Sequence, residues 1–282
     1  MSIPRFPLLI EPETLAQYLD AKDLLIIDIS RAKSYAVGHI PQAVYMEYAM
    51  LILNRPPIGG LLPNTGHLSQ LFSSVGLTPE THVVAYDDEG GGKAGRLIWT
   101  LHLLGHDSCS VLNGGIHAWA NERYPLEREP TFPSSSGSNY LASMQCLDGL
   151  VEAEYILNNL GNPEVVLLDT RTPDEYSGRK RFATRGGHIP GAVNLDWTLT
   201  LDRAQNLRWK PEQELRAMFE RIGVTLDREV IVYCQTHHRS SHIYVVLKSF
   251  GYRRVRGYVG AWSEWGNLMG VPVEEGDSTT TR

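Results

Sequence analysis

The segment 234–239 reads CQTHHR and combines one thiol with three side chains that carry, or can carry, positive charge. An apolar run precedes it at 229–233, and a helical pattern follows it from about Ser240 to Phe250. A loop that runs directly into a helix N-terminus directs backbone N–H groups inward and adds the positive end of the helix dipole. Both features stabilise a thiolate and any anion beside it. We therefore predict a reactive anionic sulfur at Cys234.

The apolar patterning predicts the elements that hold this loop. Four short runs rich in Val, Ile and Leu predict strands buried on both faces, at 24–28, 82–86, 165–169 and 229–233. Helical patterns lie between them, as at 211–223, where Leu215, Met218, Phe219 and Ile222 share one face and Gly223 ends the helix. Strands that alternate with helices predict parallel α/β sheets, one in each half of the chain. In such sheets ligands bind at the carboxyl ends of the strands, which is where Cys234 lies.

The two halves of the chain are similar at four landmarks that occur in the same order and at nearly constant spacing. The paired landmarks are 24–35 with 165–176, 38–43 with 187–192, 75–87 with 222–234, and 117–119 with 260–262. Between the halves lies the segment PTFPSSSGSN at 130–139, which has almost nothing to bury. We predict a tandem duplication, with domains at 1–129 and 146–282 joined by a linker at 130–145.

The first half differs from the second at the chemically decisive position. Asp87 stands where the second half has Cys234, and the segment DDEGGGKAGR at 87–96 offers no nucleophile. Its glycines favour a surface turn, and it is not a Walker phosphate loop because Lys93 precedes Ala94 rather than Ser or Thr. A lone Cys after a strand is usually a small buried hydrophobe, but this contrast between two otherwise similar copies favours a functional thiol. We predict that the first half is catalytically inactive.

Two histidines lie in the repeated Gly-His-Ile-Pro turn. His39 and His188 occur in both halves, including the half without a nucleophile. This predicts a structural, turn-fixing role for both.

The composition excludes several classes of protein. The 282 residues suffice for two domains with real cores, and a net charge of −6 gives no electrostatic footprint for a phosphate backbone. We expect the N-terminal segment to be neither a secretory signal nor a transit peptide, and no apolar run approaches the roughly 18 to 20 residues that cross a bilayer. Three widely spaced cysteines suit a reducing compartment. We expect a cytoplasmic protein without nucleic-acid or membrane partners, in which Cys109 and Cys146 are bystanders.

In combination the motifs resemble those of the tandem-domain rhodaneses. The motifs are Asp-Thr-Arg at 169–171 after a strand, Gly-His-Ile-Pro-Gly-Ala at 187–192, and a Cys-centred loop after the next strand but one. The resemblance covers nearly the whole chain and implies two α/β domains, each a mainly parallel sheet flanked by helices. The CQTHHR loop is similar to that of one bacterial branch of thiosulfate sulfurtransferases. It differs from the CRKGVT loop of the animal enzymes and from the CG-containing GVT loop of mercaptopyruvate sulfurtransferases.

The resemblance also implies a ping-pong reaction, thiosulfate:cyanide sulfur transfer. Cys234 would take a sulfane sulfur from thiosulfate as a persulfide, and a nucleophile such as cyanide would remove it. The backbone N–H groups that would surround the terminal sulfur belong to Gln235, Thr236, His237, His238 and Arg239. The persulfide is the covalent intermediate, and no metal or organic cofactor would be required.

Four side chains near the loop have expected roles. Arg239 would pair with a carboxylate and hold the shape of the loop, and Arg185 would face the sulfonate of the donor, although each could also be a solvated cation. Asp169 would fix the loop by hydrogen bonds rather than act as an acid or base. Trp197 would wall the pocket or belong to the core.

Three alternatives to this function have sequence features to weigh. Cys-dependent phosphatases also bind an anion in a Cys–Arg loop, but five residues separate their Cys and Arg, against four here, and the smaller loop favours sulfur. Cys234, His237, His238 and His242 could bind zinc or copper, although structural zinc normally takes ligands from two separated pairs. A non-catalytic rhodanese-like module describes the first half better than the second.

The sequence leaves the sulfur donor and the acceptor open. 3-Mercaptopyruvate is the alternative donor. The alternatives to cyanide as acceptor are a thiol, thioredoxin, or a protein in iron–sulfur or thio-cofactor assembly. We expect a monomer, because the two halves can cover each other's interface.

Overall fold

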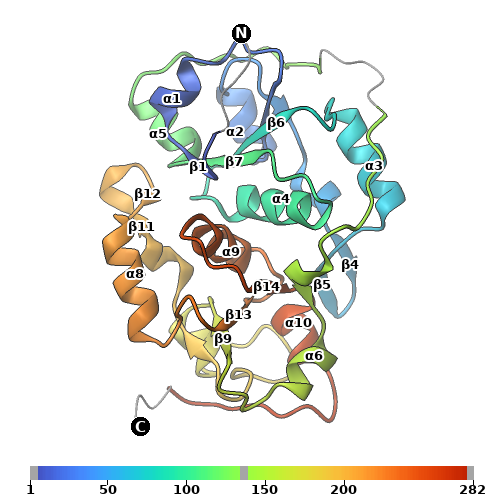
Figure 1. Cartoon of the computed structure of the whole chain (residues 1–282), viewed down its shortest axis with the longest axis vertical. Helices are drawn as coiled ribbons and strands as arrows, with labels where there is room; N and C mark the ends of the chain where they lie inside the picture. Colours follow the sequence, from blue (N-terminus) through green and yellow to red (C-terminus); the bar gives the residue numbers. More distant parts are fainter. Residues whose placement is uncertain (1–5, 134–138, 278–282) are drawn as a thin grey trace. The chain divides into compact units, whose positions relative to one another are not determined.

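All four apolar runs form strands with the predicted bounds in the computed structural model, which describes residues 6–133 and 139–277. They are β2 (Leu24–Asp28), β6 (His82–Tyr86), β9 (Val165–Asp169) and β13 (Glu229–Tyr233). Every residue of β6 and β13 is buried, as expected of strands covered on both faces. Two five-stranded sheets contain these strands, β2 and β6 in the first and β9 and β13 in the second (Figure 1).

The first sheet has the strand order β1-β7-β6-β2-β3, and all of its strand pairs are parallel. Its other strands are β1 (Leu9–Ile10), β3 (Val44–Tyr45) and β7 (Cys109–Leu112). The helices of this part of the chain are α1 (Pro12–Ala16), α2 (Ala32–Val37), η1 (Tyr48–Leu51), α3 (Thr65–Ser74), α4 (Gly92–Leu103) and α5 (Gly115–Asn121).

The second sheet has the order β10-β9-β13-β14-β8, which is the same topology in the repeat, and it too is wholly parallel. Its other strands are β8 (Leu150–Val151), β10 (Val193–Asn194) and β14 (Val255–Tyr258). The helices here are η2 (Leu147–Gly149), α6 (Ala153–Asn158), α7 (Pro173–Tyr176), η3 (Trp197–Thr200), η4 (Arg203–Gln205), α8 (Glu212–Arg221), α9 (Arg239–Ser249) and α10 (Ala261–Trp265). The predicted fold, two α/β domains with parallel sheets, is confirmed.

The chain divides into two compact units that each contain a hairpin from the opposite half of the sequence. Unit 1 comprises Met1–Ile52, Leu62–Leu147 and Leu201–Trp209, and unit 2 comprises Leu53–Leu61, Asp148–Thr200 and Lys210–Arg282. The hairpin in unit 2 pairs β4 (Leu53–Arg55) with β5 (Ile58–Leu61), and the hairpin in unit 1 pairs β11 (Leu201–Asp202) with β12 (Arg208–Trp209). This exchange of hairpins was not predicted from the sequence. The boundaries 1–129, 130–145 and 146–282 stay a prediction, and residues 134–138 of that linker lie outside the described residues.

Helix α9 is the element that carries the chain away from Cys234. It covers Arg239–Ser249, close to the predicted span, and Gly251 follows it with a φ of +85°. All residues from Ser240 to Leu247 are buried, because the helix lies in the core of unit 2 against β13 and β14. Helix α8 lies within the predicted 211–223 and buries Leu215 and Phe219.

The two repeated histidines have the structural role that their duplication predicts. Nδ1 of His39 is 3.0 Å from the carbonyl oxygen of Tyr35, and Nδ1 of His188 is 2.9 Å from that of Tyr176. Each imidazole also stacks on the ring of the same tyrosine, with centroids 3.8 Å and 3.6 Å apart. The two turns are therefore fixed in the same way in both units.

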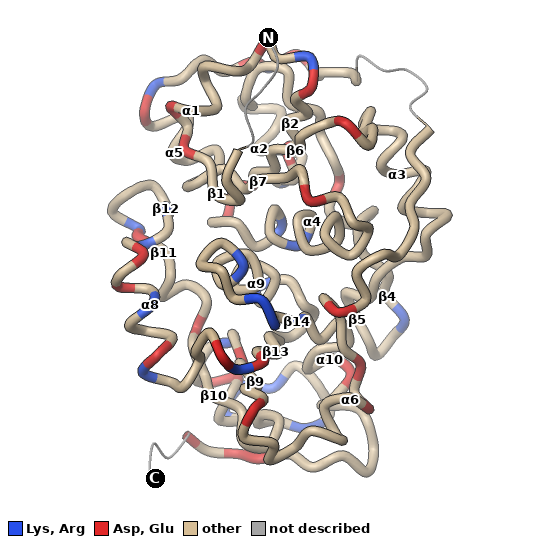
Figure 2. The backbone as a smooth tube through the Cα atoms, viewed as in Figure 1, with Lys and Arg blue, Asp and Glu red and all other residues tan. Residues whose placement is uncertain are grey.

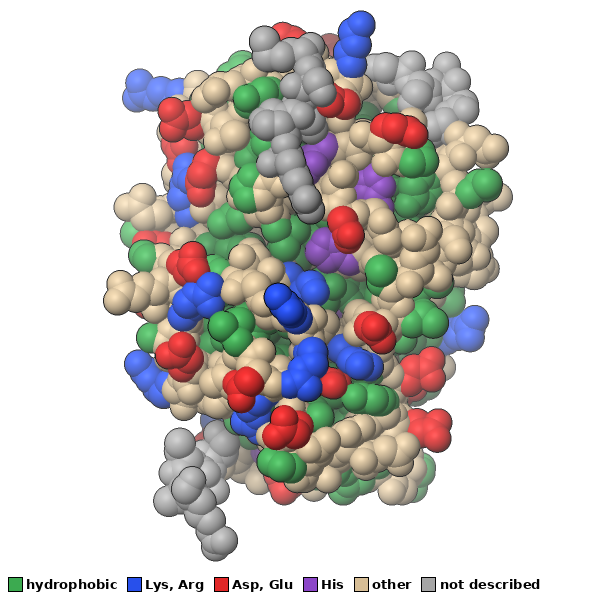
Figure 3. Space-filling view, viewed as in Figure 1, with side chains coloured by type: hydrophobic (Ala, Val, Ile, Leu, Met, Phe, Trp, Pro, Cys, Tyr) green, Lys and Arg blue, Asp and Glu red, His purple; other side chains and the backbone are tan. Residues whose placement is uncertain are grey.

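Basic and acidic residues neighbour each other along the chain and on the face shown in space-filling form (Figures 2 and 3). In unit 2, for example, Arg256 forms an ion pair of 3.2 Å with Glu229, and Arg254 donates a hydrogen bond to the carbonyl oxygen of Asp227. Among residues 6–133 and 139–277, no helix combines the length and the apolar character that a bilayer crossing requires.

Candidate active site

The Cys234 loop begins at the carboxyl end of β13 and turns directly into α9. The Cys234 side chain is fully buried, and its Sγ accepts hydrogen bonds from the His238 N–H at 3.3 Å and from the Ser240 hydroxyl at 3.5 Å. His237 has a φ of +50°, and this left-handed residue turns the chain around the sulfur. The backbone N–H groups thus converge on Sγ, as the CQTHHR pattern predicts.

Ser240 links the thiol to the imidazole of His237. The His237 Nδ1 lies 2.8 Å from the Ser240 Oγ, and both side chains are buried. Because the single hydroxyl proton of Ser240 is donated to Sγ, the His237 Nδ1–H must be the donor to Oγ. Ser240 is not among the site residues predicted from the sequence.

The surroundings of Cys234 favour a thiolate. Burial is the largest single influence and by itself raises the pKa of Cys234. The Arg239 charge, the Ser240 hydroxyl and the backbone N–H groups of Ser240 and Thr236 act in the opposite direction and together bring the pKa of Cys234 below its ordinary value. The site therefore raises the fraction of Cys234 in its nucleophilic form.

Arg239 is held by a carboxylate on α7. Its Nη1 and Nη2 donate to the two carboxylate oxygens of Glu175 at 2.7 Å and 2.8 Å, a bidentate pair. Glu175 is only 2% exposed and also completes a capping box with Thr172 at the start of α7. The expected pairing of Arg239 with a carboxylate is thus present, and Glu175 fixes a positive charge beside the thiolate.

This pair predicts a stability change in acid. Burial raises the pKa of Glu175, but the bonds to Arg239 and Thr172 outweigh it and lower that pKa from 4.5 to about 2. A folded-state pKa below the unfolded one means that the pair stabilises the fold above about pH 4.5 and that this contribution, on the order of 3 kcal/mol, is lost as the pH falls toward 2. We expect Glu175→Gln to abolish this part of the pH dependence, measured as the free energy of urea unfolding between pH 5 and pH 2.

The matched control is Asp174→Asn, on the same helix. Asp174 forms an ion pair with Arg179 in which both side chains are more than half exposed, so its loss should change stability by less than about 1 kcal/mol. Equal slopes of stability against pH in wild type and Glu175→Gln would contradict the assignment.

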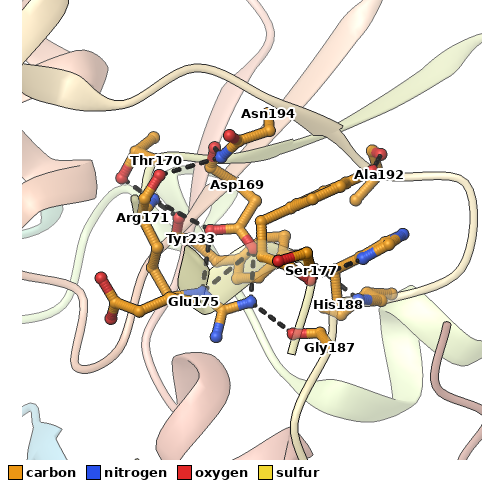
Figure 4. Close-up of polar contacts among 12 residues, drawn as sticks. Asp169, Thr170, Arg171, Glu175, Ser177, Gly187, His188, Ala192, Asn194 and Tyr233 are labelled. Atoms are coloured by element: carbon orange, nitrogen blue, oxygen red, sulfur yellow. Dashed lines mark hydrogen bonds and ion pairs between the residues drawn. The ribbon is translucent and has the colours of Figure 1, made fainter. Parts of the chain in front are cut away.

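Asp169 and Arg171 form a second buried ion pair beside the loop (Figure 4). Arg171 Nη2 donates to Asp169 Oδ2 at 2.5 Å and to the carbonyl oxygen of Gly187 at 2.7 Å, so it joins the end of β9 to the repeated turn. We expected Asp169 to bond the loop itself. Its carboxylate instead bonds Arg171, because that guanidinium is only two residues away and is also buried, and its support of the loop is indirect. Thr170 bonds the residue just before the loop, since its N–H donates to the carbonyl oxygen of Tyr233, the last residue of β13, at 2.9 Å.

Arg185 lies where backbone carbonyl groups surround its guanidinium. Nη1 donates to the carbonyl oxygen of Val271 at 2.7 Å, and Nη2 donates to those of Trp265 and Leu268 at 2.6 Å and 2.7 Å. These contacts tie the chain before Gly187 to the end of α10 and to the segment that follows it. A role for Arg185 in facing a donor sulfonate stays a prediction.

Trp197 and His242 pack together behind the loop. The two rings meet edge to face with centroids 5.4 Å apart, and Trp197 is half-buried. His242 Nε2 lies 2.8 Å from the Thr200 hydroxyl, and burial lowers the pKa of His242 to about 3. Within the described part of the chain, no group of three or more His, Cys, Asp and Glu side chains has an arrangement that could hold a metal ion. Whether Trp197 walls a substrate pocket stays a prediction.

The remaining loop residues differ in their contacts. The Gln235 side chain donates from Nε2 to the carbonyl oxygen of Phe182 at 3.1 Å. The backbone carbonyl oxygen of Gln235 accepts the Ser263 N–H at 2.9 Å. Thr236 is half-buried, and its backbone lies against Gly60 of β5. The loop is thus anchored on both sides by groups outside it.

The equivalent loop of unit 1 is filled by its own side chain. The Asp87 carboxylate accepts the N–H groups of Glu89, Gly90, Gly91 and Ala94 at 2.8 Å to 3.1 Å. The expectation of a surface turn is wrong, because the glycines are buried as they close around this carboxylate. In unit 1 the N–H groups bind an internal anion, whereas in unit 2 they face a thiol.

Glu175 and the role of Arg171 were not predicted from the sequence. A signal for Glu175 was present, since Thr172-Pro173-Asp174-Glu175 has the spacing of a capping box with Pro at the first helical position. Arg171 belongs to the Asp-Thr-Arg motif, but the sequence does not show that its guanidinium turns back to Asp169.

Comparisons with known proteins match both halves of the chain. The family model of the rhodanese-like domain matches residues 11–122 and 152–268. The chain is 42% identical to the thiosulfate sulfurtransferase of Azotobacter vinelandii over 95% of its length and 97% of that protein, and 43% identical to that of Pseudomonas aeruginosa over the same shares. Among solved structures, SseA of Escherichia coli, a 3-mercaptopyruvate sulfotransferase, matches with a TM-score of 0.80 at 26% identity, over 92% of this chain and 100% of that one.

Proposed function

The chain belongs to the rhodanese-like domain family, and on that basis we propose that it is a sulfurtransferase that moves a sulfane sulfur from thiosulfate to a thiophilic acceptor through Cys234. The observation that carries the proposal is the convergence of the His238 N–H, the Ser240 hydroxyl and the Arg239 charge on one sulfur atom. Unit 1 has no such nucleophile at the equivalent position, where Asp87 stands, and is proposed to be catalytically silent.

The reaction has two steps that balance without any further reagent. The Cys234 thiolate attacks the outer sulfur of thiosulfate, the S–S bond of thiosulfate breaks, and its electron pair leaves with sulfite. Charge is conserved in this step, because a thiolate with one negative charge and thiosulfate with two give a persulfide with one and sulfite with two. An acceptor such as cyanide then attacks the outer sulfur and leaves as thiocyanate. The S–S bond of the persulfide breaks, and its electron pair stays on the Cys234 Sγ, which becomes a thiolate again. We propose that no metal or organic cofactor takes part.

The loop stabilises the charge that this cycle places on sulfur. The outer atom of the persulfide is anionic, and we propose that the N–H groups of the loop from Gln235 to Arg239 donate to it, as the His238 N–H donates to Sγ. These groups belong to the backbone and to the start of α9, so they do not have to reorganise when the charge moves from Sγ to the outer sulfur.

Thiosulfate is the proposed donor because the relatives at 42% and 43% identity are thiosulfate sulfurtransferases. 3-Mercaptopyruvate is the alternative donor, supported by the likeness to SseA. For the acceptor we propose a small thiophile with cyanide as the laboratory example, and a thiol, thioredoxin or a sulfur-trafficking protein as the alternatives.

The test is intact-protein mass spectrometry before and after addition of thiosulfate, and again after addition of cyanide. We expect a gain of one sulfur atom on Cys234 that cyanide removes, with peptide mapping to place it. A gain with 3-mercaptopyruvate alone would replace the donor. No gain with either compound would contradict the proposal.

A further inference from the structure

The hairpin of β4 and β5 reaches the Cys234 loop of unit 2, although it comes from the first half of the sequence. Figure 1 shows β5 beside α10, and these two elements are in contact. At Gly60 the backbone of the hairpin meets Thr236 so closely that a Cβ would clash with the Thr236 carbonyl oxygen and lie 2.8 Å from the Thr236 Cβ. Real Cβ atoms essentially never approach backbone or side chain so closely, so this contact requires glycine.

Ser263 fastens the hairpin and the loop to each other. Its N–H donates to the carbonyl oxygen of Gln235 at 2.9 Å, and its Oγ accepts the Gly59 N–H at 3.1 Å. Within the hairpin, Asn54 Oδ1 accepts the Gly60 N–H at 2.9 Å, which fixes the glycine that meets Thr236. The hairpin is therefore hydrogen-bonded into the site rather than merely adjacent to it.

The exchanged hairpin of unit 1 shows that the glycines are not a general feature of these hairpins. Leu201 follows Leu53 by 201 − 53 = 148 positions, close to the 234 − 87 = 147 that separate the two loops. At this spacing the counterparts of Gly59 and Gly60 are Leu207 and Arg208. The pair of glycines stands in the hairpin that meets the loop with the thiol, and large side chains stand in the hairpin of the unit without one.

The contact acts on one peptide group of the loop. The carbonyl of Thr236 and the N–H of His237 share a planar peptide, so a contact that fixes the carbonyl also fixes the direction of the N–H. This peptide leads into His237, whose φ of +50° few residues other than glycine adopt without support. The next N–H along the chain, that of His238, donates to the Cys234 Sγ at 3.3 Å.

We propose that the hairpin Leu53–Leu61, through Gly60 and the Gly59–Ser263 link, is a positioning element that holds the Thr236–His237 peptide so that the loop N–H groups converge on the Cys234 sulfur. The inference rests on the proposed function in that the sulfur held this way is the proposed persulfide carrier. It assigns the first half of the chain a part in the reaction, because that half supplies this hairpin.

The experiment compares Gly60→Ala with Gly161→Ala in the full chain. Both glycines have nearly the same φ, +73° and +76°, but an added Cβ at Gly161 meets no atom within 4 Å. The rate of Cys234 alkylation by iodoacetamide, followed against pH by mass spectrometry, reports the thiolate directly. We expect its midpoint in Gly60→Ala to rise by about one pH unit, and transfer from thiosulfate to fall about 10-fold to 100-fold. In Gly161→Ala both quantities should match wild type, because the added methyl group meets no atom of the loop. The charged and titratable neighbours Arg239, His237 and His238 are the same in both variants, so a difference between them reports the contact at Gly60.

An alkylation midpoint in folded Gly60→Ala equal to that of Gly161→Ala would overturn the inference. If Gly60→Ala fails to fold, Ser263→Ala decides in its place, since it removes the Oγ link to Gly59 and keeps the Ser263 N–H bond to Gln235. An unchanged midpoint there also overturns the inference. The proposed sulfur transfer and the proposed role of the hairpin are tested by different measurements. A wild-type protein that gains no sulfur from either donor refutes sulfur transfer. The alkylation midpoints test the hairpin whether or not sulfur is transferred.

Discussion

Cys234→Ala is expected to lower the rate of thiocyanate formation from thiosulfate and cyanide by at least about 10⁴-fold, to the uncatalysed rate. Covalent catalysis has no second route once its nucleophile is removed, because the loop N–H groups bind the sulfur but cannot displace sulfite. The fold should persist. The substitution removes the two hydrogen bonds that Sγ accepts but keeps the backbone bond from the Trp262 N–H to the Cys234 carbonyl oxygen at 2.9 Å, which ties this residue to α10.

The control is Cys146→Ala, which removes an exposed free cysteine of unit 1. It should transfer sulfur at the wild-type rate, and the free energy of unfolding of Cys234→Ala should differ from wild type by about 1 kcal/mol. Turnover by folded Cys234→Ala above the uncatalysed rate would refute Cys234 as the sulfur carrier. Loss of transfer in Cys146→Ala would indicate a second thiol in the reaction.

The four strands β2, β6, β9 and β13 were predictable residue by residue because their apolar runs are continuous. A strand such as 229–233 is buried on both faces and admits no polar position between its charged first residue and the loop, so its bounds follow from the sequence. The hairpins were not predictable for the opposite reason. β4, β5, β11 and β12 have two to four residues each, and long-range packing rather than local pattern assigns each hairpin to the opposite unit.

The site was predictable where chemistry and local structure coincide. Cys234 and the loop that enters α9 follow from a strand, a polar loop and a helix in succession. Partners that come from distant segments could not be identified in the same way, since Glu175 lies 64 residues before Arg239 and Gly60 lies far outside the second half. The surface turn expected at 87–96 was wrong because the sequence does not reveal that a carboxylate can satisfy the N–H groups of its own loop.

The two loops show how one backbone arrangement supports two outcomes. In unit 1 the Asp87 carboxylate accepts four N–H groups and leaves none of those four donors for a substrate anion. In unit 2 the equivalent position carries Cys234, whose sulfur extends less far into the loop and accepts the His238 N–H. An anion that arrives on the sulfur, such as the outer atom of a persulfide, would take the place that the Asp87 carboxylate has in unit 1.

Arg239→Gln is expected to lower sulfur transfer at neutral pH on the order of 10²-fold, the size of effect seen when one fixed group that stabilises a reacting anion is removed. The substitution removes the positive charge nearest to Cys234 and leaves the buried Glu175 carboxylate without it. Both changes raise the pKa of the Cys234 thiol, so the midpoint of alkylation against pH should rise. Breaking a buried pair from one side also destabilises the fold, by about 3 kcal/mol.

The double variant Glu175→Gln/Arg239→Gln separates the two effects. It removes both charges together, so it should recover part of the stability that Arg239→Gln loses but not the reactivity of the thiol, because the charge beside Sγ is still missing. Arg179→Gln is the matched control, since it breaks an exposed pair with Asp174 on the same helix and should leave both quantities unchanged. Alkylation of Cys234 in Arg239→Gln with the wild-type pH midpoint would show that Arg239 only supports the loop. A double variant as reactive as wild type would place the activation of Cys234 in the backbone N–H groups alone.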